Sequence, residues 1–173
     1  SRAVRTPSHG ETAAMDTLAA RAVPPDVPLP IYPAVVGNPA LRSEELIAYE
    51  LGYREQTTEQ FSWDLAVFLN RYQRIINAMA GTAYPVFGPN PYLVMPLTLA
   101  NNQAGTVYGA ELAATYAIRP TWRLRGAYTY LLMDLQPVEG RGSTARENAE
   151  CPSSQVYLQS EWDLGNKWEL DLI

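Results

Sequence analysis

Apolar residues recur at every second position along much of this chain. For example, Phe61, Trp63 and Leu65 alternate with Ser62 and Asp64. A period of two places alternate side chains on opposite faces of a β-strand, so each stretch predicts a strand with one apolar and one polar face. The stretches with this pattern are 47–54, 61–70, 108–118, 122–135, 154–164 and 168–172. The sequence therefore predicts an all-β fold of about six antiparallel strands.

The connections between these strands alternate in length. The short ones are 56–60, 119–121 and 165–167, and the long ones are 8–42, 77–103 and 136–152. All the long connections fall on one edge of the predicted sheet, and the five prolines between 24 and 33 argue against regular structure within 8–42. Tight turns at one end and long loops at the other are typical of outer-membrane barrels, in which the turns are periplasmic and the loops extracellular.

Aromatic residues gather near the tight turns, on the apolar side of each strand. Trp and Tyr favour the membrane interface, because the ring lies in hydrocarbon while its polar tip reaches the headgroups. The pattern therefore predicts a periplasmic aromatic girdle in contact with outer-membrane lipid. The alternative is that these rings fill the ends of a soluble β-sandwich core. The predicted girdle comprises Tyr53, Trp63, Tyr116, Trp122, Trp162 and Trp168.

The composition excludes several classes of function. No apolar run reaches the roughly 18 residues of a membrane helix. The mean hydropathy of −0.19 is compatible with membrane-spanning strands, because only every second residue of such a strand faces lipid. The 13 basic residues, against 18 acidic ones, form no Lys-rich patch, which disfavours nucleic-acid binding. Cys151 and His9 lie far apart and indicate neither a metal site nor a nucleophilic pair. We therefore expect no enzyme, metal or cofactor.

Five segments resemble the barrel region of TonB-dependent outer-membrane receptors. They are Arg-Ala-Val-Arg-Thr-Pro-Ser at 2–8, Asn-Pro-Ala-Leu-Arg-Ser-Glu-Glu at 38–45, Tyr-Glu-Leu-Gly-Tyr-Arg at 49–54, Asn-Gln-Ala-Gly-Thr-Val-Tyr-Gly-Ala-Glu-Leu at 102–112, and the tyrosine-rich strand 122–130. Their occurrence together and in order is more specific than any one of them.

This resemblance implies a barrel of 22 strands in the Gram-negative outer membrane, plugged by an N-terminal domain whose extreme N-terminus is pulled by TonB. Residues 1–173 would then form one partial barrel domain of about six strands, without the plug, and both ends of the chain look cut. An open sheet of this kind has two unpaired edges and a lipid face in water, so we do not expect it to fold stably alone.

Two glutamates are the best candidates for a role in the lumen. Glu50 and Glu111 both have the polar parity of their strands. The resemblance implies that each faces arginines of the plug domain, where charge-assisted hydrogen bonds would hold the plug in place. The other charges on the polar faces are more simply read as solvated wall charges of a polar lumen.

Ligand contacts are expected from the long loops. Aromatic and cationic side chains suit an anionic, aromatic metal chelate such as a ferric siderophore. Haem, cobalamin, a copper complex or a carbohydrate stay open as substrates, and a passive porin or a soluble binding module stay open as functions. The loop residues in question are Tyr84, Phe87, Tyr92, Met95, Arg141 and Arg146.

Overall fold

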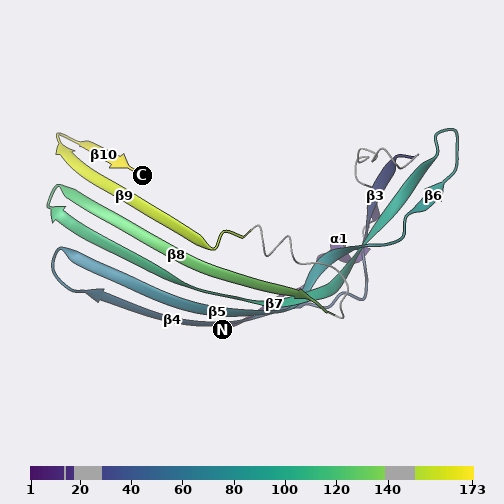
Figure 1. Cartoon of the computed structure of the whole chain (residues 1–173), viewed down its shortest axis with the longest axis horizontal. Coiled ribbons are helices and arrows are strands. Elements are labelled where there is room, and N and C mark those ends of the chain that lie inside the picture. The colour runs from purple at the N-terminus through teal and green to yellow at the C-terminus, as the bar shows by residue number, and fades with distance from the viewer. Residues whose placement is uncertain (14, 18–28, 139–150) are drawn as a thin grey trace.

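A single β-sheet dominates the structure (Figure 1). The computed structural model describes residues 1–13, 15–17, 29–138 and 151–173. Within them, ten strands join one sheet, and the short helix α1 (His9–Ala13) follows the first strand. The strands are β1 (Arg2–Arg5), β2 (Met15–Thr17), β3 (Ile31–Val36), β4 (Glu44–Gln56), β5 (Phe61–Ala80), β6 (Tyr84–Val86), β7 (Tyr92–Arg119), β8 (Trp122–Pro137), β9 (Ser154–Gly165) and β10 (Trp168–Leu172).

The six predicted strands are confirmed as β4, β5, β7, β8, β9 and β10. They lie side by side in this order, each antiparallel to its neighbour, and the long strands curve together across the molecule (Figure 1). The short strand β1 pairs with β4 at one edge, and β10 forms the other edge. The sheet is therefore antiparallel along this path and is not closed.

The register keeps the two faces of the sheet apart. Tyr53 pairs with Leu65 and Leu65 with Leu112, whereas Ala66 pairs with Glu111, so the two parities do not mix between β4 and β8. We call the side that carries Trp63 the Trp63 face and the opposite side the Glu111 face. As the tight turns fix this register, a slip of one residue would move every side chain to the other face.

The predicted long loop 77–103 is wrong. β5 continues to Ala80, β7 begins at Tyr92, and the two strands pair along this extension, with β6 folded back onto β7. Tyr84, Tyr92 and Met95 therefore lie in strands, not in a loop. The reason is that successive residues of this extension are half-buried, so the alternation by which strands are recognised in a sequence is missing.

The stretch 8–42 also contains regular structure that its prolines did not suggest. β3 pairs in parallel with β7 and antiparallel with β2, and Ala34 at its centre is only 1% exposed. Pro33 lies within β3, but β2 pairs only with residues 34–36. The proline thus falls just outside the second pairing, where its missing N–H is tolerated.

The helix α1 is built on a capping box. The backbone N–H of Ser8 donates to the Glu11 carboxylate, and the Glu11 N–H donates to Ser8 Oγ. Arg5 on β1 binds the same carboxylate through both Nη atoms, at 2.9 and 3.1 Å. These hydrogen bonds, that of Arg5 first, lower the pKa of Glu11 to about 2. Glu11 therefore stays ionised near neutral pH and ties the helix to β1.

A bulge marks where the β5–β7 extension departs from the long strands. The pairing slips between Tyr72 and Ile75, and Arg74 adopts a positive φ of 57°. Asn101 secures the site, since its Nδ2 donates to the carbonyls of Arg42 and Arg74. Beyond this point Figure 1 shows β6 and the start of β7 turning away from the curve of the long strands.

Candidate functional site

The Trp63 face is apolar and largely uncovered. Tyr49, Leu51, Val156 and Leu158 on this face are 56%, 73%, 80% and 64% exposed. Among the described residues the buried apolar core is limited to Ala34, Val94 and Val107. No second sheet packs on either face of the long strands within the described residues, which disfavours a β-sandwich. An apolar face this exposed indicates contact with a membrane or with another protein surface.

The predicted girdle residues lie on the Trp63 face near the tight turns, in ring contacts that cross the strands. The ring centroids of Tyr53 and Trp63 are 5.3 Å apart, and Trp122 and Trp162 stack at 5.8 Å. The indole N–H of Trp122 donates to Ser160 Oγ at 3.0 Å. Trp168 differs from the others, because a bulge separates it from the regular β9–β10 register.

This aromatic row crosses the sheet obliquely. Tyr53 of β4 pairs with Leu65 of β5, and the next ring, Trp63, lies two residues nearer the tight turn than Leu65. The same step of two residues recurs from β5 to β7 and from β7 to β8. Trp122 and Trp162 are then paired directly. The row shifts by six residues over four strand-to-strand steps. With a rise of about 3.4 Å per residue and strands about 4.8 Å apart, that slope is about 45°. Transmembrane barrel strands tilt by a similar angle.

The Glu111 face carries charges, several of which pair across strands. Arg54 on β4 binds Asp64 on β5, with Nε 2.6 Å from Oδ2. Near the other edge, Glu161 on β9 receives both Arg123 and Arg125 of β8, each at 3.2 Å. These pairs are partly exposed, so they contribute little to stability and serve mainly to balance charge along the wall.

Glu50 and Glu111 lie on this same face, as their parity predicts. Glu50 pairs with Phe68 and Glu111 with Ala66, so the two carboxylates flank β5 diagonally, with Cα atoms on the order of 12 Å apart. Both residues are exposed. Two carboxylates at this separation can bind two cationic groups of one facing surface, but they do not form a pair with each other.

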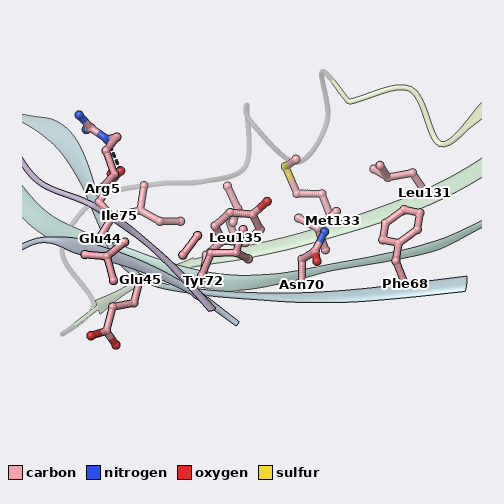
Figure 2. A pocket seen from close by; sticks show the side chains of 14 residues that line it. Arg5, Glu44, Glu45, Phe68, Asn70, Tyr72, Ile75, Leu131, Met133 and Leu135 are labelled. Atoms are coloured by element: carbon pink, nitrogen blue, oxygen red, sulfur yellow. Dashed lines mark hydrogen bonds and ion pairs between the residues drawn. The ribbon is translucent and has the colours of Figure 1, made fainter. Parts of the chain in front are cut away.

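An apolar hollow interrupts the Glu111 face, and the sequence did not predict it. Its volume is about 650 Å³. Figure 2 shows Phe68 and Asn70 from β5 and Met133 from β8 projecting to the same side of the strands. We call it the Phe68 pocket. Its apolar lining consists of Val4, Leu46, Phe68, Tyr72, Ile75, Val107, Leu131, Met133 and Leu135, in addition to Ala3.

Two glycines of β7 lie against residues that line the Phe68 pocket. A Cβ added at Gly109 would meet the Tyr130 carbonyl oxygen more closely than real Cβ atoms do, and would lie 2.8 Å from Cζ of Phe68. Gly105 is similarly tight, since its Cβ would lie 2.7 Å from Cα of Leu135. Both glycines therefore let β8 approach β7 closely, and Gly109 also makes room for the Phe68 ring.

Ion pairs lie at one end of the Phe68 pocket. Arg5 binds both Glu44 and Glu11. Glu45 accepts from Arg2 at 2.7 Å and from Arg74 at 2.6 Å. The charged groups at this end, labelled in part in Figure 2, thus already have partners within the chain.

Comparison with known proteins agrees with this architecture. The model of the family described as TonB dependent receptor-like, beta-barrel matches residues 1–150. The chain belongs to this family. No curated protein matches the sequence. Among solved structures, the siderophore receptor PirA from Acinetobacter baumannii superposes with a TM-score of 0.64 and 14% identity. The superposition covers 98% of this chain and 24% of that receptor, so the chain spans about a quarter of its length.

Four of the expected ligand residues of this TonB-dependent receptor barrel lie in or beside the β6–β7 hairpin. Phe87 is 83% exposed in the turn after β6, Tyr84 is 45% exposed, and Tyr92 packs edge-on against Tyr32 at 5.1 Å. Met95 lies in β7, paired with Pro33. Arg141 and Arg146 lie outside the described residues.

In the part of the chain that the structure describes, no helix has the length and apolar character to cross a membrane. Across residues 1–13, 15–17, 29–138 and 151–173, no three His, Cys, Asp or Glu side chains gather as metal ligands. Cys151 is a free thiol.

Proposed function

We propose that this chain forms part of the wall of an outer-membrane receptor that takes up a ferric siderophore, energised by TonB. The observation that carries the proposal is the family match over residues 1–150. The uncovered apolar Trp63 face and its oblique aromatic row support it, because lipid would cover that face and the row would follow the periplasmic interface. The Glu111 face would then line the lumen.

In this arrangement we assign Glu50 and Glu111 to the plug domain of the same receptor. Both carboxylates are exposed on the lumen-facing side and are separated by one strand. Guanidinium groups of a plug surface would bind them through charge-assisted hydrogen bonds, bidentate where the geometry allows. The plug would thereby be held against β4 and β7 until ligand or pulling force releases it.

Uptake of radioactive ferric siderophore by cells that make the full-length receptor tests the proposed function. We expect accumulation to require both TonB and the proton-motive force, and to fall to the background of receptor-free cells when either is removed. Surface binding should persist without TonB. Accumulation that continues unchanged without TonB would contradict active transport and indicate passive diffusion through a pore.

A further inference from the structure

The Phe68 pocket is an apolar hollow on a face that otherwise carries charged and polar side chains. We propose that it receives a neutral, apolar arm of the transported iron chelate, aromatic or aliphatic, while the charged iron centre is held elsewhere. This inference rests on the proposed function and specifies the class of chelate. The observation behind it is the apolar lining that β5, β7 and β8 contribute. Phe68, Leu131 and Met133 of this lining occupy positions on the Glu111 face, where charged or polar side chains are expected.

The size of the pocket fits a small-molecule group. Its volume of about 650 Å³ falls within the range of roughly 300–1,000 Å³ that is usual for ligand pockets. Gly109 lies against Phe68 and Gly105 against Leu135, so close packing onto the β7 backbone positions these two residues of the lining. A preformed apolar pocket gains affinity because little ordering is needed on binding.

The charges around the pocket indicate that the bound group is neutral. Arg5 at one end of the pocket is engaged by Glu11 and Glu44. The Glu45 carboxylate is bound by Arg2 and Arg74 and points away from the pocket (Figure 2). They therefore offer no unpaired charge to a carboxylate or a cationic iron centre. An apolar group, in contrast, would displace water from Phe68 and Met133 without breaking these ion pairs.

The position of the pocket favours a ligand that arrives from outside. Phe68 is seven residues from the start of β5, and Ile75 is fourteen residues from it. At about 3.3 Å per residue and a tilt of about 45°, the pocket extends from about 16 to about 33 Å above the tight turns. The pocket therefore begins in the outer part of the apolar band, which is about 25 Å tall in barrels, and extends beyond it toward the outside.

Two ferric chelates that differ in a single arm test the inference on the full-length receptor in intact, energy-depleted cells. They are ferrioxamine B acylated on its terminal amine with either an acetyl or a benzoyl group, so their charge is equal. We expect the benzoyl chelate to bind about tenfold more tightly, as burial of a phenyl ring predicts. Met133→Gln should reduce this preference to about threefold or less. Thr115→Gln, on the same face but outside the pocket, should leave it unchanged.

The outcomes separate the inference from the proposed function. Equal binding of the two chelates, or a benzoyl preference that survives Met133→Gln, overturns the pocket assignment and leaves the receptor function standing. Binding of neither chelate contradicts siderophore uptake and the pocket together. In a Cys151→Ser background, which removes the native free thiol, a thiol from Met133→Cys that N-phenylmaleimide reaches only after the plug is unfolded would identify the plug as the occupant. It would also overturn the inference.

Discussion

Replacing Gly109 by alanine is expected to destabilise the barrel by about 1–3 kcal/mol, the usual cost of overpacking. The new Cβ would collide with the Tyr130 carbonyl oxygen of β8, which belongs to the backbone and cannot rotate away. It would also meet the Phe68 ring at 2.8 Å. β7 and β8 must therefore separate locally. Urea unfolding of the full-length receptor in lipid vesicles measures the effect as a lower midpoint.

The matched control is Gly52→Ala, on the same face of β4. The nearest atom to its added Cβ is the Leu65 carbonyl oxygen at 3.8 Å, an ordinary van der Waals distance. Alanine at this position should be neutral or slightly stabilising, because glycine is unfavourable in a strand interior. Equal unfolding midpoints for Gly109→Ala and Gly52→Ala would show that β7 and β8 do not approach as closely as described.

The second large effect is expected from Glu50→Ala combined with Glu111→Ala. If these carboxylates hold the plug, each loss leaves guanidinium groups in the lumen without a partner, at a cost of about 1.5–3 kcal/mol per charged hydrogen bond. The barrel should still insert and bind ligand at the surface. The plug should unfold at lower urea concentration, and energy-dependent uptake should change. Hydrogen exchange of the plug amides measures the loosening directly.

The control for this pair must also remove two carboxylates, but ones that do not lie on the Glu111 face. Suitable residues are found in the β4–β5 hairpin, which carries Glu50. Glu55, which accepts a hydrogen bond from Tyr53, and Glu59 in the tight turn meet this condition. Asp64 is unsuitable, since its loss would leave Arg54 unpaired. Wild-type plug exchange in the Glu50/Glu111 variant, or equal damage in the Glu55/Glu59 variant, would refute plug anchoring.

The long strands could be predicted from the sequence because each separates two different surroundings. Phe61, Trp63 and Leu65 on one side and Ser62 and Asp64 on the other leave a clear period of two. The same parity placed Glu50 and Glu111 on one face, which the register of β4, β5 and β7 confirms. Their role in holding the plug stays a prediction.

Other elements could not be predicted, because their two sides are alike. Ala34 of β3 and Val94 of β7 are buried, and the residues around them are half-buried in succession, so no alternation marks these strands. The Phe68 pocket was missed for a related reason. In β8 the apolar run Leu131–Met133 occupies both parities, which hides the apolar patch on the otherwise polar face. That loss of alternation is itself a usable signal.

The central claim, that alternate residues of these strands face lipid, is tested most directly by a nitroxide scan along β5 of the full-length receptor in lipid vesicles. Labels at Leu65, Val67 and Leu69 should be relaxed strongly by oxygen, which concentrates in lipid. Labels at Asp64, Ala66 and Asn70 should respond little to it. This result would place the Trp63 face in the membrane. Equal oxygen accessibility at both sets, or higher accessibility at the second set, would contradict the account.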